Sequence, residues 1–129
     1  TARLTSFSTA PGGAAAGVMI RGSTNANSRF VSVSFVNGQG GQFSYRATAG
    51  GPVTSVAFSG TALPRWFQLK RVGNLFSGYK SSDGNTWTSV GSVTLSTMPS
   101  AATAGLAVTS NSDGTLVTAT YENVGVTQP

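Results

Sequence analysis

Few side chains of this protein could act as acids, bases or metal ligands. The chain has three acidic residues, Asp83, Asp113 and Glu122, and it contains neither His nor Cys. Zinc, haem and iron–sulfur centres, and Ser–His–Asp or Cys–His catalysis, therefore lack their required groups. Glycoside hydrolysis needs two carboxylates about 5–9.5 Å apart. Asp83 and Asp113 each precede a Gly, an arrangement typical of turns in which Asp caps its own backbone. We therefore expect a protein that is not an enzyme.

One enzymatic alternative stays open. A lyase that works without His could use a tyrosine as its base, and the chain offers Tyr45, Tyr79 and Tyr121. Their spacing does not single out one of them.

Calcium is the metal that this residue set could hold. Ca²⁺ accepts backbone carbonyls, amide oxygens and a small number of carboxylates. Asp113, Glu122 and Asn123 supply such oxygens near the end of the chain. We expect either no cofactor or a structural Ca²⁺ at these residues, and the shortage of acids in a cationic chain favours no cofactor.

Aromatic and cationic side chains point to a different chemistry, the binding of sugars. A pyranose ring packs on an exposed aromatic plane, and guanidinium or ammonium groups bind hydroxyls and carboxylates. Trp66 and Tyr79 occupy positions opposite the apolar residues of their segments, and so do Arg21, Arg46 and Lys70. If their segments share a sheet, these five residues form one glycan-binding face.

The charge balance favours an acidic partner only weakly. Eight Lys and Arg residues against three acids give a net charge of +5. The cations are scattered, and only Lys70 and Arg71 are adjacent, so we expect no nucleic-acid partner. No apolar stretch approaches the ~20 residues of a membrane span. Gly, Ser and Thr fill 52 of 129 positions, and this composition without Cys favours a secreted or cell-surface protein.

The segments that must position these residues are predicted to be strands. Short runs of β-branched and aromatic residues recur between clusters of Gly, Asn, Asp and Pro, and no segment has helical periodicity. Ten strands are expected, at residues 2–8, 15–21, 29–36, 42–48, 53–58, 66–72, 75–81, 87–95, 104–110 and 116–126. Ten strands in one small domain, residues 1–126, predict an all-β, antiparallel two-sheet sandwich of the jelly-roll kind, followed by a tail at 127–129.

Period-two alternation assigns a side to each residue of a strand. Phe67 and Leu69 fall on the core side of their strand, and Trp66 and Lys70 fall on the other side. The same pattern predicts that Leu106 and Val108 help to fill the core.

One turn carries a recognisable motif. Residues 81–87, Ser-Ser-Asp-Gly-Asn-Thr-Trp, resemble the Asp-box hairpin of β-propellers, although the segment is one residue short and occurs once. The Asp-box is a folding element rather than a catalytic one. We expect a structural turn with Trp87 packed beneath it.

Six blocks together resemble a bacterial family: AGVMIR at 16–21, FSYR at 43–46, WFQLKR at 66–71, SSDGNTW at 81–87, GLAVTS at 105–110 and ATYENV at 119–124. In this order they are similar to the concanavalin/laminin-G-like β-sandwich modules of the DUF1349 type, which are accessory domains of secreted bacterial proteins. The resemblance implies a concanavalin A-like sandwich and a carbohydrate-binding role.

Two departures from that family bear on function. Glu122 stands where the family usually has Asp, which weakens a calcium role there. Family domains also begin upstream of the position that matches Thr1, so we expect either a shortened variant or a fragment that lacks amino-terminal strands.

The sequence favours two candidate functions. The first is a non-catalytic module that binds a polysaccharide, with an acidic one slightly favoured. The alternative is a structural or adhesion module of a bacterial surface protein or extracellular filament, in which a neighbouring chain or domain completes the amino-terminal sheet edge.

Overall fold

The computed structural model describes residues 1–8, 12–112 and 114–127. Within these ranges the chain forms ten strands and no helix. The strands are β1 (Ala2–Phe7), β2 (Ala15–Arg21), β3 (Phe30–Val36), β4 (Gly40–Arg46), β5 (Thr54–Phe58), β6 (Arg65–Val72), β7 (Leu75–Ser81), β8 (Thr88–Thr94), β9 (Thr103–Thr109) and β10 (Ala119–Glu122). A helix long and apolar enough to cross a membrane is accordingly not found in this part of the chain.

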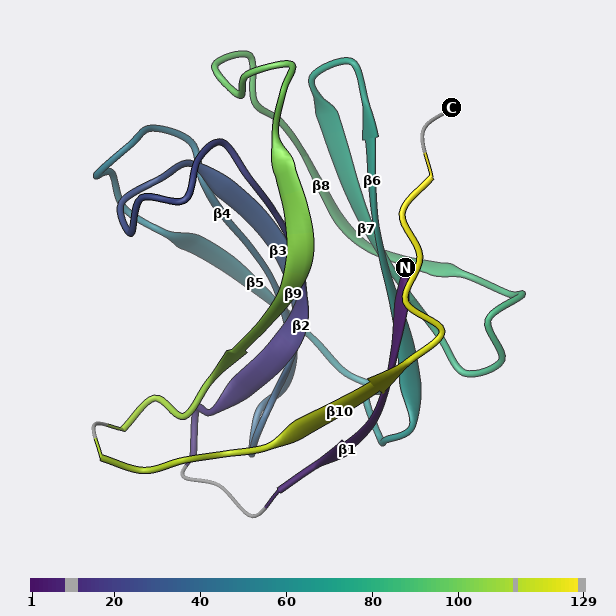
Figure 1. Ribbon diagram of the computed structural model, residues 1–129. Coiled ribbons are helices and arrows are strands. Elements are labelled where there is room, and N and C mark those ends of the chain that lie inside the picture. Colours follow the sequence, from purple (N-terminus) through teal and green to yellow (C-terminus); the bar gives the residue numbers. More distant parts are fainter. Residues whose placement is uncertain (9–11, 113, 128–129) are drawn as a thin grey trace.

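The strands form two antiparallel sheets of five, which confirms the predicted β-sandwich (Figure 1). Sheet A has the order β10-β1-β6-β7-β8, and sheet B has the order β5-β4-β3-β2-β9. In sheet A, β1 lies between β10 and β6, and its residues Arg3 and Leu4 are paired on both sides. The last strand is shorter than the expected 116–126, because it pairs with β1 only over Ala119–Glu122 and Asn123 then takes a left-handed backbone with φ of 53°.

Glycines let the chain reverse between strands. Gly38 and Gly84, in the Asn37-Gly38 and Asp83-Gly84 turns, have φ values of 80° and 79°, which side chains with a Cβ rarely adopt. Both turns stand where the sequence predicts them. The predicted turn at Asp113-Gly114 falls partly outside the described residues, because Asp113 is not among them.

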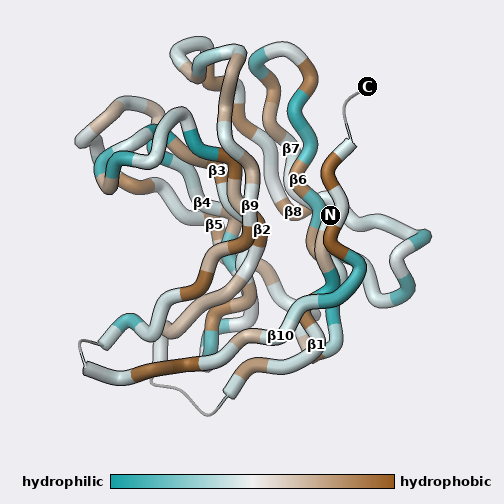
Figure 2. The backbone as a smooth tube through the Cα atoms, in the orientation of Figure 1, coloured by the Kyte–Doolittle hydropathy of each residue, from teal (hydrophilic) through white to brown (hydrophobic). Residues whose placement is uncertain are grey.

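The core lies between the sheets and follows the alternation of the strands. Its largest fully buried side chains are Leu4, Val31, Val33, Phe43, Phe67 and Phe76. Hydrophobic positions recur along the strands of both sheets in Figure 2. Phe67 is buried as predicted, and Trp66 on the opposite side of β6 is only half-buried.

Two glycines of sheet A receive one phenylalanine of sheet B. Gly78 of β7 and Gly91 of β8 are directly paired. A Cβ on Gly78 would lie 2.8 Å from Cδ2 of Phe43, and a Cβ on Gly91 would lie 2.6 Å from Cδ1 of the same ring. The Phe43 ring therefore fills a hollow that exists only because both positions lack a side chain.

The strand β9 departs from expectation. Leu106 and Val108 are on its core side, since they pair with the buried Val18 and Ala16. They are nevertheless 44% and 53% exposed. β9 is an edge strand of sheet B, and the core side of an edge strand is buried only where the other sheet extends over it. The prediction that these two residues fill the core is therefore wrong.

Candidate ligand-binding face

The outer side of sheet A brings together three of the five residues that we expected to bind sugar. Trp66 and Lys70 are on β6 and Tyr79 is on β7, and all three point away from the core, as does Gln68 between them. We call Trp66, Gln68, Lys70 and Tyr79 the aromatic face.

Strand register sets the spacing of the aromatic face. Gln68 is directly opposite Tyr79, while Trp66 and Lys70 are opposite Ser81 and Ser77. Tyr79 is therefore the diagonal neighbour of Trp66 and of Lys70 across the two strands, a spacing of about 7–8 Å between Cα atoms. Trp66 and Lys70 are four residues apart, or about 13 Å along the strand. A bulge in the β7–β8 pairing lies between Gly78 and Tyr79, and such bulges change the direction of neighbouring side chains.

The aromatic face offers polar groups with few partners. Among the described residues, the Tyr79 hydroxyl and the Lys70 ammonium have no hydrogen bond or ion pair. Gln68 donates through Nε2 to Oγ1 of Thr1 at 3.2 Å, which leaves its Oε1 as an acceptor. The face thus presents a phenol, an amide oxygen and a cation beside an aromatic ring. Sequence reasoning missed Gln68, although its place in the Trp66–Lys70 alternation was the available signal.

Trp66 is partly covered by the 81–87 turn. A Cβ on Gly84 would lie 2.8 Å from Cε2 of Trp66, so the backbone of the turn rests against the indole. Trp87 contacts Trp66 edge to face, with ring centroids 6.5 Å apart. Both indoles are half-buried. The expected structural turn is present, but the indole beneath it is that of Trp66 rather than Trp87, which packs against Trp66 instead. This packing reduces the part of Trp66 that could receive a ligand.

Asp83 builds that turn. Its Oδ1 accepts hydrogen bonds from Ser81 Oγ at 2.9 Å and from the backbone amides of Asn85 and Thr86, each at 2.8 Å. Ser81 Oγ in turn accepts from the amides of Asp83 and Gly84. The two amides and the Ser81 hydroxyl lower the pKa of Asp83 from 3.8 to about 2. This carboxylate therefore holds the turn together.

Arg21 and Arg46, the other two expected sugar ligands, lie on sheet B. They are neighbours there, because Phe30 pairs with Arg21 on one side and with Arg46 on the other. Their guanidinium carbons are 6.0 and 5.4 Å from the centroid of the Phe30 ring. The predicted single face of five residues thus divides into two groups on opposite outer sides of the sandwich.

Most cations bind loops rather than face solvent. Arg46 donates to the carbonyls of Gly51, Ala26 and Ser28, and Arg71 donates to those of Gly73, Met98 and Pro99. The other cations with partners are Arg3, Arg21, Arg29, Arg65 and Lys80. Lys70 alone of the eight has no such partner in the described ranges.

The expected calcium ligands are not assembled by the described residues. Asp113 lies outside those residues. Glu122 accepts a hydrogen bond from Arg3 Nη1 at 2.8 Å in an exposed ion pair, and Asn123 occupies the left-handed kink after β10. Within the part of the chain that the structure describes, no three or more His, Cys, Asp or Glu side chains come together.

One tyrosine joins the two sheets. The Tyr121 hydroxyl of β10 is shared between the carbonyl oxygens of Ala107 at 2.8 Å and Gly17 at 3.2 Å, both in sheet B. Burial raises the pKa of this phenol to about 12, and the hydrogen bond to Gly17 opposes that rise. Tyr121 is therefore placed to hold the sandwich together. Tyr45 packs against Phe43 in the core, and Tyr79 is on the aromatic face.

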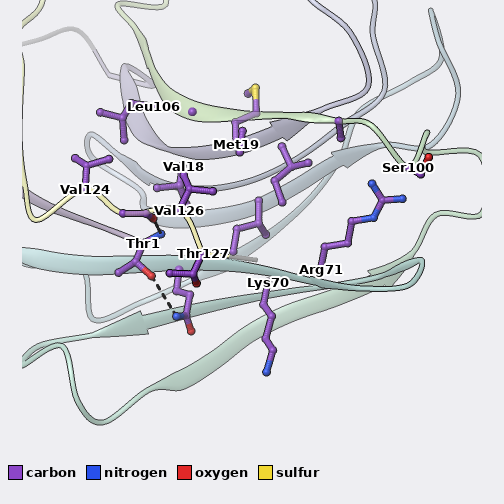
Figure 3. Close-up of a pocket in the computed structure, with 17 residues that line it drawn as sticks. Thr1, Val18, Met19, Lys70, Arg71, Ser100, Leu106, Val124, Val126 and Thr127 are labelled. Atoms are coloured by element: carbon purple, nitrogen blue, oxygen red, sulfur yellow. Dashed lines mark hydrogen bonds between the residues drawn. The ribbon is translucent and has the colours of Figure 1, made fainter. Parts of the chain in front are cut away.

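A cleft of about 500 Å³ opens between the sheets beside β9 (Figure 3). Leu106 and Val18 of sheet B line it on one side, and Leu69 of β6 lines it on the other. Val124 and Val126, which follow β10, line it too. In Figure 3, Arg71 and Lys70 extend to opposite sides of β6, so Lys70 belongs to the aromatic face.

The fold and these sites define a two-sheet, all-β sandwich with one aromatic outer face. No protein-family model matches the chain, and no curated protein or solved structure matches it either.

Proposed function

We propose that the protein is a non-catalytic carbohydrate-binding module that uses the aromatic face. The observation that carries this proposal is the placement of Trp66, Gln68, Lys70 and Tyr79 side by side on the outside of one sheet, where the polar groups of Tyr79 and Lys70 have no partner among the residues that the structure describes. The resemblance to accessory modules of the DUF1349 type supports the same role. A secreted or cell-surface location suits it, because polysaccharides are found there.

Each residue has a part in this proposal. The Tyr79 ring, with the open portion of Trp66, packs against the apolar face of a pyranose. The Tyr79 hydroxyl and the Gln68 Oε1 bind sugar hydroxyls. Lys70 binds a carboxylate or sulfate, and this contact gives acidic polysaccharides their slight advantage. Arg21 and Arg46 have no part in this face, since they are on sheet B.

Affinity electrophoresis in gels that contain neutral or acidic polysaccharides tests the proposal. Each variant is compared with itself in a gel without polysaccharide, because a charge change alters mobility. Tyr79→Ala is expected to weaken binding about tenfold in every gel that retards the wild type. Lys70→Ala is expected to reduce retardation in acidic gels to the level seen in neutral gels and to leave retardation in neutral gels unchanged.

Matched controls lie away from the aromatic face, one just before β3 and one on β4 of sheet B. Arg29→Ala removes the same charge as Lys70→Ala, and Gln42→Ala removes an outward-facing amide like that of Gln68. Relative to their own mobility in a gel without polysaccharide, both controls are expected to be retarded as much as the wild type. Unchanged retardation of Tyr79→Ala, or an equal loss in Arg29→Ala, would refute the aromatic face as the binding site.

One observation favours the second candidate, a structural or adhesion module. β9 is an edge strand with apolar side chains exposed on its core side, and such strands pair with other chains. The expected open edge was the amino-terminal one, whereas the described β1 has neighbours on both sides.

A further inference from the structure

β9 lacks a strand on its outer edge in the described structure (Figure 1). Six of its seven residues are exposed, and only Ala107 is partly covered. Its core side carries Leu106 and Val108, both about half exposed. The cleft between the sheets continues this apolar surface to Val124 and Val126, which are 54% and 73% exposed.

The outer edge of β9 has none of the features that prevent edge strands of separate molecules from pairing. Proteins protect an edge strand with a charged side chain, a proline or a bulge. The segment Thr-Ala-Gly-Leu-Ala-Val-Thr at 103–109 has no charge and no proline, and it pairs with β2 in an unbroken register. A chain of net charge +5 repels its own copies, so two copies meet with least repulsion along an uncharged edge.

The sequence of β9 is complementary to itself. In an antiparallel pair centred on Leu106, each residue meets its counterpart from the other end of the strand. Leu106 meets Leu106, Ala104 meets Val108, and Thr103 meets Thr109. The apolar side chains then meet on the core side, and the hydroxyls of the two threonines meet on the outer side, where Thr–Thr pairs stabilise sheets.

The other edges fit a second copy less well. β8 has a register shift against β7, and centring it on Gly91 would place Val90 and Val93 opposite serines. β10 has four residues and ends in Glu122, which is paired with Arg3. β5 has five residues, and centring it on Val56 would place Thr54 opposite Phe58.

We propose that two copies of this chain associate through β9, in an antiparallel twofold pair centred on Leu106. The pair joins two B sheets into one continuous sheet of ten strands. It covers Leu106 and Val108 and brings each copy against the open cleft of the other. This interface is independent of the aromatic face, which is on sheet A.

The association is expected to be weak. Stable interfaces bury about 1,200–2,000 Å² of surface. The area buried by one pair of seven-residue strands with the adjoining valines is at or below the lower end of that range. Dissociation constants from micromolar to millimolar follow, and salt strengthens the pair because it screens the repulsion between two cationic copies.

A single-cysteine experiment tests the register directly, because the chain has no cysteine of its own. Opposite residues of an antiparallel pair have Cα atoms about 4.5–5.5 Å apart, within the range of a disulfide. Under mild oxidation Leu106→Cys is expected to form linked dimers at least tenfold faster than Val56→Cys. Val56 is the matched control, since it lies on the core side of the opposite edge of sheet B and is 49% exposed.

Val108→Cys is the register control. In the proposed pair, Val108 is displaced from its own counterpart by four residues, about 13 Å along the strand, which is too far for a disulfide. A mixture of Ala104→Cys and Val108→Cys should instead give linked heterodimers. Equal rates for Leu106→Cys, Val108→Cys and Val56→Cys would overturn the proposal.

Light scattering of the full chain gives a second readout. The mass of the wild type should rise from monomer toward dimer between micromolar and millimolar concentration, Leu106→Lys should stay monomeric, and Val56→Lys should behave like the wild type. A wild type that stays monomeric throughout, or a dimer that survives Leu106→Lys, would show that β9 does not join two copies. Either outcome leaves the gel assays of the aromatic face unaffected.

Discussion

The contact of Phe43 with Gly78 and Gly91 predicts that one added methyl group will separate the sheets. Phe43 is 1% exposed, and the two glycines face it from a directly paired position. Neither glycine has a positive φ, so alanine meets no backbone strain there. A Cβ on Gly91 would lie 2.6 Å from Cδ1 and 2.8 Å from Cγ of the ring. The conflict is steric, and it involves a rigid aromatic ring.

The expected cost follows from how far these atoms must move. Carbon atoms in contact are about 3.5–4.0 Å apart, so the ring must shift by roughly 1 Å from its packed position. Overpacking of this kind costs about 1–3 kcal/mol, and we expect about 2 kcal/mol for Gly91→Ala. Phe43→Ala alone should cost about 3–5 kcal/mol. Because alanine lacks the Cγ and Cδ1 atoms that the new methyl group would strike, the double variant should be more stable than additivity predicts, by about 1–2 kcal/mol.

Urea unfolding followed by tryptophan fluorescence measures these differences, since Trp66 and Trp87 are both half-buried. Gly105→Ala is the matched control, because Gly105 is also a strand glycine but a Cβ there meets nothing within 4 Å. It should be neutral or stabilising by up to about 1 kcal/mol. If Gly91→Ala is as stable as Gly105→Ala, or if the double variant is strictly additive, the proposed hollow is wrong.

Three further predictions concern single polar groups. Tyr121→Phe should lower the free energy of unfolding by about 1 kcal/mol. The raised pKa of about 12 means that the wild type loses this advantage between pH 10 and 12, so urea curves of the two proteins should converge there. Asp83→Ala should lower the melting temperature and red-shift the emission of Trp66. Because the pKa of Asp83 falls from 3.8 to about 2, the wild type should keep its advantage above pH 4 and lose it toward pH 2 in thermal melts. Arg46→Lys should accelerate proteolytic cleavage within residues 47–52, because lysine cannot make all three carbonyl contacts.

The strands and turns were predictable because their signals are local. Alternation located all ten strands, and it gave the correct side for Phe67, Trp66 and Tyr79. Asn37-Gly38 and Asp83-Gly84 marked turns because few residues adopt a positive φ. These features depend on neighbours within a few residues, which the sequence displays directly.

The arrangement between strands was not predictable in the same way. Alternation tells which side of its own strand Arg46 occupies, and it does not tell which sheet contains that strand. Arg21 and Arg46 were therefore grouped with Trp66 and Tyr79, although a whole sandwich separates them. Leu106 and Val108 were placed in the core for a related reason, since alternation does not distinguish an edge strand from a central one.

The positive charge of the chain has a different meaning once the partners of each cation are known. A net charge of +5 suggests a surface for polyanions. However, seven of the eight cations contact carbonyls, a hydroxyl or a carboxylate of the described chain, so they hold loops and strands in place. A cation that donates to a carbonyl has fewer donors left for a ligand. In the proposed function, any preference for acidic glycans would therefore depend mainly on Lys70, the cation without a partner among the described residues, and ring stacking and hydroxyl geometry would contribute more to selection than charge.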